Sequence, residues 1–365
     1  MKPGESIEIV VGPRGSWRVE RLAALDQVRE PWDGLAEATG HPFATWEWIE
    51  PRWRSLGGAR ELYAFACRDR EGEQRAILPM YVASSRPVRT ARFVSYGSVN
   101  SPVCAPEDRE AAARATRAVL GPGRDRCRLL YAEKMPGRQG WAELLRARVV
   151  AEHEDPLIHL DGRSWDDFLA GRSKRRRKKI RSEERRLGRE HELVVRRTTE
   201  PDRLGADMDI LFRLHGRRWE GESTGVFEAE RGVMHREIAA GMLERGWLRL
   251  WIEEVDGVPA AAYYSFRFAN SEWLYGSGRD PRFDRLSVGG VLLSNVIRDA
   301  CDDGVEDFRF LEGGESYKLE LADDDYRPQS LLLGEGMLAR AALVAVSAVQ
   351  KAPDGVRARV MRFAR

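Results

Sequence analysis

The feature that most constrains the fold of this chain is a pattern that occurs twice. In residues 61–83, two apolar strand-like runs surround a polar, glycine-containing turn, and residues 247–268 repeat this order around Asp256-Gly257. Such pairs of runs predict β-hairpins. A predicted helix precedes each hairpin, and a strand, a helix and a strand follow it, which favours a mixed α/β or α+β architecture. Identity between the halves is weak, so the duplication is an inference from topology, and a chance likeness of two α/β halves is the alternative.

The length of 365 residues is sufficient for two domains of ordinary size. We expect one domain over residues 1–155, a second over residues 156–335 and a helical tail over residues 336–365. The predicted strands are residues 17–22, 61–67, 74–83, 92–99, 128–132, 247–255, 259–268, 272–277 and 305–311, and the predicted helices are residues 25–39, 46–56, 107–120, 210–219, 231–245 and 290–301.

Composition limits the classes of protein to consider. Hydrophobic residues make up 42% of the chain, which supports a substantial core, and the net charge of +2 predicts no particular partner. The four cysteines are scattered without a CxxC pair, so we expect no metal site and a reducing, cytoplasmic location. The N-terminus lacks an apolar signal segment, and the apolar stretch 338–349 is shorter than the roughly 20 residues of a membrane-spanning helix. We therefore expect a protein that is not integral to a membrane.

Five motifs in the second half resemble a known family. They are Leu214–Trp219, Trp247–Leu250, Asp256–Ala261, Ser287–Gly290 and Asp307–Lys318. In order and spacing they resemble the GNAT acetyltransferases associated with bacterial cellulose and exopolysaccharide synthesis, which are related to Fem-type peptidyltransferases with two GNAT-like domains. The likeness covers residues 160–330 well and the first half loosely, through residues 41–49. It implies tandem GNAT-like domains, each a mixed, mostly antiparallel sheet flanked by helices. It also implies acetyl-CoA or another acyl-CoA as co-substrate and a role in polysaccharide biosynthesis.

Acyl transfer from a CoA thioester requires a site for the pyrophosphate. Backbone N–H groups at a helix N-terminus suit this task, and glycines allow a phosphate to approach the backbone closely. Ser287, Val288, Gly289 and Gly290 open a predicted helix, and Arg285 lies just before them. The usual GNAT loop reads Arg/Gln-x-x-Gly-x-Gly/Ala, so the spacing here departs from it, and another activated acyl donor stays possible. The alternative is a helix capped by Ser287, with glycines that allow close packing.

The acceptor amine must also lose a proton before it attacks. Glu312 and Glu315 flank Gly313-Gly314 beyond a predicted strand, and either carboxylate is a candidate base. Tyr317 is a candidate proton donor to the departing thiolate, and Lys318 is a candidate contact for a phosphate or sugar-phosphate. The alternative makes both glutamates solvated loop residues around an ordinary turn.

Three further residues are candidates for an acceptor pocket. His215 and Trp219 are four residues apart and share a helix face, where Trp219 can stack on a sugar or base. The neighbouring residues Tyr263 and Tyr264 point to opposite faces of a strand, one to the core and one to the cleft, and we assign Tyr264 to substrate binding. For His215, the alternative is a purely structural helical histidine.

Residues 172–189 form a predicted basic helix with eleven Lys and Arg residues against two glutamates. This charge can attract tRNA, anionic lipid or an acidic glycan, and the absence of aromatic residues in the segment makes any nucleic-acid contact one to the backbone. The alternative is a solvated helix that guides anionic substrates. The arginine-rich tail can lie on an anionic membrane surface or pack as a closing helix.

Three functional hypotheses follow. The leading one is a CoA-dependent N- or O-acyltransferase acting on a small sugar, peptide or amino-acid-like acceptor. The second is a Fem-like transferase that takes its acyl group from aminoacyl-tRNA, favoured by the basic helix and the imperfect loop. The third is a non-catalytic binding module with a degenerate GNAT fold.

Overall fold

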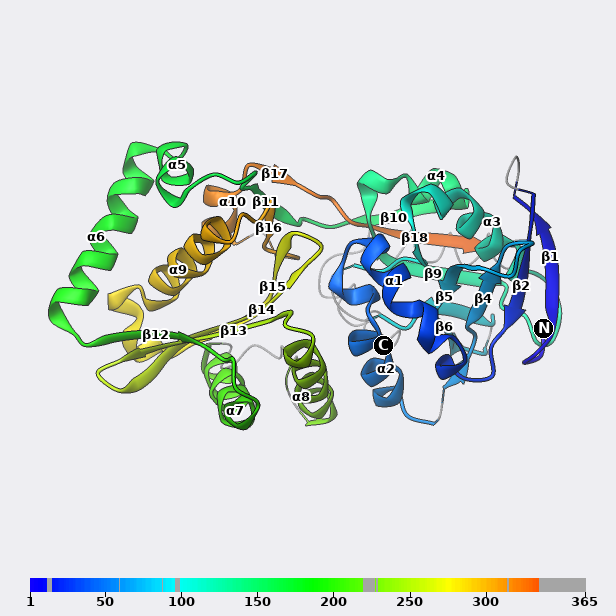
Figure 1. The fold of residues 1–365 in the computed structure, drawn as a ribbon, viewed down its shortest axis with the longest axis horizontal. Helices are drawn as coiled ribbons and strands as arrows, with labels where there is room; N and C mark the ends of the chain where they lie inside the picture. The colour runs from blue at the N-terminus through cyan, green and yellow to red at the C-terminus, as the bar shows by residue number, and fades with distance from the viewer. Residues whose placement is uncertain are drawn as a thin grey trace. The chain divides into compact units, whose positions relative to one another are not determined.

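The computed structural model describes residues 1–11, 15–58, 60–86, 88–95, 99–218, 227, 229–313 and 315–334. The chain divides into unit 1, residues 1–153 and 327–365, and unit 2, residues 154–326 (Figure 1). The predicted second domain ran to residue 335, whereas strand β18 (Gln329–Gly334) pairs in unit 1 with β9 and β10. Strands β9 and β10 lie far from β18 in the sequence, so local sequence patterns do not predict this pairing. The predicted tail, residues 336–365, lies outside the described residues.

Unit 1 contains two sheets, in the strand orders β1-β2-β4-β5-β8 and β10-β18-β9-β7-β6-β3. The predicted strand 74–83 is divided at Pro79, because proline lacks the N–H group that a strand ladder needs. The strands are β1 Ser6–Val10, β2 Ser16–Arg21, β3 Glu61–Leu62, β4 Phe65–Arg68, β5 Gln74–Leu78, β6 Met80–Ser84, β7 Thr90–Phe93, β8 Val103–Cys104, β9 Leu129–Met135 and β10 Arg148–Glu152, and the helices are α1 Arg29–Thr39, α2 Trp46–Ser55, α3 Arg109–Val119 and α4 Trp141–Leu145.

Unit 2 contains one seven-stranded sheet in the order β12-β13-β14-β15-β16-β11-β17. All neighbours are antiparallel except β15 and β16. The strands are β11 Pro156–His159, β12 Leu193–Arg197, β13 Leu248–Val255, β14 Val258–Phe268, β15 Ser271–Arg279, β16 Asp307–Arg309 and β17 Asp324–Asp325, and the helices are α5 Trp165–Ala170, α6 Lys174–Glu190, α7 Pro201–Arg218, α8 Ala229–Glu244, α9 Val288–Asp302 and α10 Ser316–Leu321.

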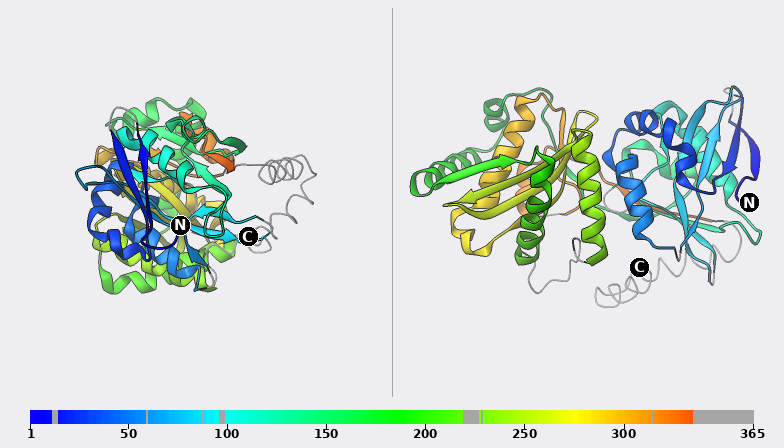
Figure 2. Two further views of the ribbon diagram at one scale, coloured as in Figure 1. Left: turned by 90° about the vertical axis from the view of Figure 1, so that its right-hand side faces the viewer. Right: turned by 60° about the horizontal axis from the view of Figure 1, so that its bottom comes forward.

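Helices cover both faces of the unit 2 sheet. Helices α7 and α8 pack on one face, and α9 packs on the opposite face together with α5 and α6 (Figures 1 and 2). Apolar residues of α9 such as Val291, Leu292 and Val296 form the core with the sheet on that side. The exposed face of α6 is strongly charged, since only Ile180 and Leu187 of that helix are buried. None of the helices in the described part of the chain is both long and apolar enough to cross a membrane.

The predicted architecture of mixed, mostly antiparallel sheets flanked by helices is confirmed. Each unit also contains one parallel pair, β7–β9 in unit 1 and β15–β16 in unit 2. In both pairs the chain passes through a helix between the two strands, α3 in the first case and α9 in the second. A parallel connection requires such a crossover. The two units therefore share this part of their topology.

Candidate functional site

The parallel strands β15 and β16 diverge shortly after they begin. They pair only over Ser271–Trp273 and Asp307–Arg309, whereas β15 continues alone on that side to Arg279. The pairing with β14 skips Tyr275, which makes Tyr275 the extra residue of a β-bulge. Ligands of α/β sheets bind beyond the carboxyl ends of parallel strands, where the chain directions separate. The structure therefore places a candidate site at the ends of β15 and β16.

The predicted phosphate loop lies beside this opening, at the start of α9. Ser287 is the N-cap residue, but its hydroxyl donates to a Glu183 carboxylate oxygen at 2.8 Å instead of capping the helix. The Gly290 amide donates to the Ser287 carbonyl at 2.9 Å, and the Arg186 side chain donates to the Arg285 carbonyl. Helix α6 thus contacts the loop and brings the Glu183 carboxylate to the N-terminus of α9, where the helix dipole favours negative charge.

The two glycines of the loop have no packing reason among the described residues. A Cβ atom at Gly289 would lie 3.8 Å from Arg279 Cδ, and one at Gly290 would lie 3.8 Å from a Glu183 oxygen. Both distances are ordinary van der Waals contacts, and neither glycine has a positive φ. Glycine within a helix costs about 1 kcal/mol relative to alanine. These contacts therefore do not show the close packing that the alternative explanation requires.

The motif after β16 folds into a cluster around Lys318. This lysine is buried, donates to the Glu312 carbonyl at 3.0 Å and pairs with Glu315 at 2.9 Å. Gly313 has a φ of 132°, and a Cβ atom there would lie 2.3 Å from a Glu315 oxygen, so this position requires glycine. The Glu312 side chain is exposed, whereas Tyr317 is half-buried and packs edge-on against Phe310. Glu315 and Lys318 are thus a structured pair, whereas the Glu312 side chain faces solvent.

Asp155 lies at the same end of β16, a position that the sequence did not predict. It is 1% exposed and precedes β11, whose Pro156 carbonyl accepts from the Phe310 amide at 3.0 Å. Neither carboxylate oxygen has a hydrogen-bond partner of normal geometry among the described residues. Burial raises the pKa of Asp155 to about 7, against the opposing attraction of Arg309 and Lys318. An acid titrating near neutral pH is suited to proton transfer.

Arg309 is the second site residue that the sequence did not reveal. Its guanidinium lies between two aromatic rings, 4.6 Å from the centroid of Trp273 and 4.2 Å from that of Tyr326. One nitrogen donates to Asp307 at 3.3 Å, while Nε and Nη1 are buried without a partner in the described part of the chain. Buried donors of this kind are suited to an anionic or carbonyl oxygen. The position of Arg309 within the Asp307–Lys318 motif was the available signal.

His215 contacts β15 at Ser277, in the part of the strand that does not pair with β16. Its Nδ1 donates to the Ser277 carbonyl at 2.8 Å, so Nε2 is the basic nitrogen of the neutral ring. This contact keeps His215 next to the candidate site, as an acceptor-pocket residue would be. Trp219, predicted on the same face of α7, lies outside the described residues.

The assignment of Tyr264 to substrate binding does not fit the structure. Tyr264 is fully buried among the rings of Phe227, His235 and Tyr275, and burial raises its pKa well above the usual range. We correct it to a packing residue on the face covered by α7 and α8. The two tyrosines do point to opposite faces: Tyr263 donates to the Gly289 carbonyl at 3.1 Å and is thus the one next to the loop. The alternation of side chains along a strand predicts that the two tyrosines point to opposite faces of the sheet. It does not predict which of the two faces lies next to the phosphate loop.

No group of three or more His, Cys, Asp or Glu side chains within the described ranges is arranged to hold a metal ion.

Comparisons with known proteins agree with the fold of the chain. Residues 174–319 match the family described as acetyltransferase (GNAT) domain. The structure of FemX superposes with a TM-score of 0.59 at 10% identity, covering 90% of this chain and 100% of the other. The C-terminal domain of a protein described as a putative lysylphosphatidylglycerol synthetase from Agrobacterium fabrum gives 0.55 at 15% identity, with 89% and 96% coverage. L-PGS from Bacillus licheniformis gives 0.53 at 10% identity, with 88% and 97% coverage.

At these identities the solved structures show a shared fold alone. A comparison of the sequence with curated proteins found no match. The family match and the fold together show that unit 2 has the fold of a GNAT-type acyltransferase.

Proposed function

We propose that the chain is an acyltransferase that moves an acyl group from an acyl-CoA to an amine or hydroxyl of a sugar, peptide or amino-acid-like acceptor. The observation that carries this proposal is the divergence of β15 and β16 beyond Trp273, with two buried charged residues, Asp155 and Lys318, at the same end of the neighbouring strand β16. A sugar of polysaccharide biosynthesis is the acceptor class that the sequence resemblance favours. The four cysteines are buried free thiols, which supports the proposed cytoplasmic location.

In this proposal the thioester lies along the open side of β15 and the pyrophosphate at the start of α9. Asp155 accepts the proton of the acceptor nitrogen or oxygen, which then forms a bond to the acyl carbon. The carbon–sulfur bond breaks, and Tyr317 donates a proton to the departing thiolate. Arg309 and Lys318 stabilise negative charge that develops on the acyl oxygen. Glu315 orients Lys318 through their ion pair, and Glu312 faces the incoming acceptor.

The loop glycines provide a test in which stability and binding change in opposite directions. Replacing both Gly289 and Gly290 with alanine should raise the free energy of unfolding by roughly 1–2 kcal/mol, because both contacts are tolerated and alanine favours helix. The same double variant should bind acetyl-CoA at least about tenfold more weakly, because its methyl groups keep the pyrophosphate from the backbone. Urea unfolding and equilibrium dialysis measure the two effects. A stabilised variant with unchanged affinity would show that the loop does not hold the donor.

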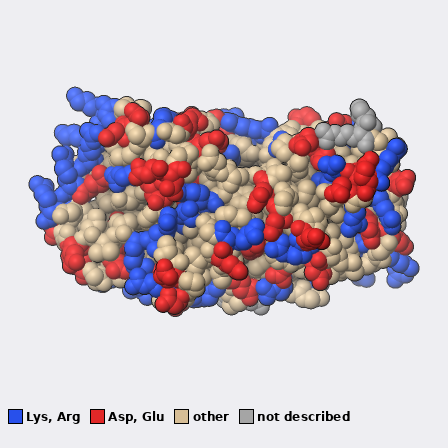
Figure 3. All heavy atoms as spheres, viewed as in Figure 1, with Lys and Arg blue, Asp and Glu red and all other residues tan. Residues whose placement is uncertain are grey.

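A second candidate function is transfer from aminoacyl-tRNA. Glu183 already brings negative charge to the start of α9, where a CoA pyrophosphate must either displace it or bind beside it. The solvent face of α6 is also a dense cationic surface, visible as the blue cluster over that helix in Figure 3. Its exposed cations are Lys174, Arg175, Lys178, Lys179, Arg181, Arg185 and Arg189. Such a surface suits a nucleic-acid backbone or another anionic surface.

Donor binding separates the candidates without knowledge of the acceptor. Radiolabelled acetyl-CoA and radiolabelled aminoacyl-tRNA are each dialysed or filter-bound against the purified protein, with the Gly289→Ala/Gly290→Ala variant in parallel. Saturable binding of acetyl-CoA that the variant weakens supports the leading proposal. Binding of aminoacyl-tRNA alone, with a steep loss at higher salt, supports the second. A folded protein that binds neither donor is a non-catalytic module, and the proposal is then wrong.

A further inference from the structure

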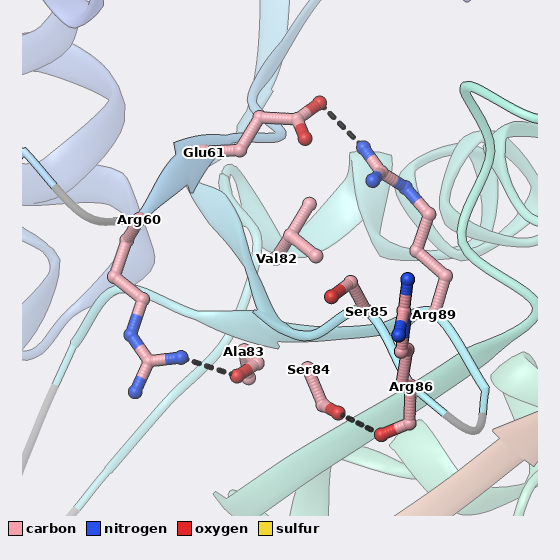
Figure 4. A pocket seen from close by; sticks show the side chains of 8 residues that line it. All are labelled: Arg60, Glu61, Val82, Ala83, Ser84, Ser85, Arg86 and Arg89. Atoms are coloured by element: carbon pink, nitrogen blue, oxygen red, sulfur yellow. Dashed lines mark hydrogen bonds and ion pairs between the residues drawn. The ribbon is translucent and has the colours of Figure 1, made fainter.

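The geometry points to a second ligand site: we propose that a hollow in unit 1 binds a phosphate group. The hollow has a volume of about 430 Å³ and lies between the start of β3 and the turn that joins β6 to β7 (Figure 4). Its polar lining consists of Arg60, Glu61, Ser84, Ser85, Arg86 and Arg89. Small-molecule sites usually measure some 300–1,000 Å³, so the hollow has room for a phosphate and part of the molecule that carries it. This site is in unit 1 and does not depend on the proposed acyl transfer.

Positive charge in the hollow exceeds what its own acid neutralises. Glu61 accepts hydrogen bonds from Arg89 and, at 2.7 Å, from Arg21. These two arginines hold the pKa of Glu61 below its ordinary value, although desolvation opposes them. One carboxylate is therefore shared by two guanidinium groups before Arg60 and Arg86 are counted. The lining carries a clear cationic excess.

The remaining cations of the lining are Arg60 and Arg86. One Arg60 nitrogen donates to the Ala83 carbonyl, which fixes its guanidinium beside β6, as Figure 4 shows. The Ser84 hydroxyl donates to the Arg86 carbonyl at 2.7 Å and so shapes the turn that carries Arg86. No residue in the described part of the chain pairs with the Arg86 guanidinium. Arg60 and Arg86 can thus both present N–H groups to an added anion.

The chemistry of the lining fits a phosphate group. Guanidinium groups bind phosphate through paired N–H donors, and the Ser85 hydroxyl adds a further donor. The apolar part of the described lining is limited to Val82 and Ala83, without an aromatic ring on which a base or sugar would stack. Recognition therefore rests on the phosphate itself. A soluble phosphate ester and a phospholipid headgroup both supply this group.

Calorimetric titration with inorganic pyrophosphate tests the site in the full-length protein, with the Gly289→Ala/Gly290→Ala background in every sample so that the phosphate loop proposed in unit 2 contributes little. We expect saturable binding, and a loss of roughly tenfold to hundredfold in affinity for Arg60→Ala/Arg86→Ala, because the double variant lacks two guanidinium groups that donate charged hydrogen bonds to the anion. Arg86→Glu, a change at an exposed side chain, should abolish binding without altering the melting temperature. The matched control is Arg114→Ala, which removes an equally charged, surface-paired arginine from α3 of the same unit and should leave binding unchanged.

Vesicles distinguish the two sources of phosphate. Co-sedimentation with phosphatidylglycerol vesicles, compared with phosphatidylcholine vesicles, is measured for the wild-type protein and both variants. Pyrophosphate binding that the variants lose indicates a soluble phosphate ester. Vesicle binding that the variants lose, without pyrophosphate binding, indicates a lipid headgroup. If neither probe binds saturably, or if Arg60→Ala/Arg86→Ala and Arg86→Glu bind as the wild type does, the hollow is not a phosphate site.

Discussion

Replacing Asp155 with asparagine is expected to lower kcat/KM for acyl transfer by roughly a hundredfold to ten-thousandfold, the contribution typical of a positioned general base. The asparagine side chain has nearly the shape of the aspartate but cannot accept the acceptor proton. The wild-type rate should rise with pH through about 7, the value to which burial raises the pKa of Asp155. The variant should lack this rise. A pH–rate profile of both proteins measures the effect.

Stability should change in the opposite direction, which excludes misfolding as the cause. Because the folded-state pKa of Asp155 is raised from 3.8 to about 7, its stabilising contribution is full below about pH 4 and is lost as pH rises through about 7. The asparagine variant should therefore be more stable than the wild type at pH 8, and this advantage should vanish near pH 4. Urea unfolding at both pH values measures it.

Glu253 provides the matched control for Asp155. Its carboxylate on β13 is fully buried and has no hydrogen-bond partner among the described residues, and burial raises its pKa to about 8. Glu253→Gln should therefore stabilise the protein at high pH by the same mechanism, while transfer activity is retained. Loss of activity in Glu253→Gln, together with retention in Asp155→Asn, would show that Asp155 does not accept the proton.

Replacing Gly278 with alanine is expected to destabilise unit 2 by about 3 kcal/mol, at the upper end of the range for overpacking. The added Cβ atom would lie 2.4 Å from the His215 backbone nitrogen and 2.6 Å from the Leu214 carbonyl carbon. Both atoms belong to the main chain of α7, so the whole helix must move away from β15. Urea unfolding measures the change, and a loss below about 1 kcal/mol would contradict this packing.

A second glycine, on α7 itself, serves as the control. Gly205 has no atom within 4 Å of the position of an added Cβ atom. Gly205→Ala should therefore stabilise the protein by roughly 0.5–1 kcal/mol, because alanine is the better helix former. If Gly278→Ala lowers the free energy of unfolding and Gly205→Ala raises it, the loss at Gly278 comes from the close approach of α7 to β15 and not from a general effect of alanine.

Local patterns in the sequence predicted the hairpin of unit 2 to within a residue or two. Asp256 and Gly257 both adopt a positive φ, as a tight two-residue turn requires, and the flanking runs are strongly apolar. The corresponding region of unit 1 was predicted less well, since Pro79 divides one predicted strand between two sheets. The Pro79 signal was present, but the change of sheet depends on contacts with distant strands.

The candidate site was predictable only where its residues are contiguous. The motif around Lys318 is read directly from the sequence, and so are the loop glycines. Asp155 lies far from that motif in the chain and reaches it only through the antiparallel pairing of β11 with β16. The contact of Glu183 with Ser287 likewise depends on how α6 docks beside α9, which charge patterns do not specify.

Hydrogen–deuterium exchange is the most direct measurement of where the donor lies. The purified protein is compared with and without the donor that binds in the dialysis experiment. Donor should slow exchange in residues 274–279 of β15 and at Val288 and Gly289 of α9, where the strands diverge and the helix begins. Protection confined to other segments, with these amides exchanging at unchanged rates, would contradict the assignment of the reaction to this opening.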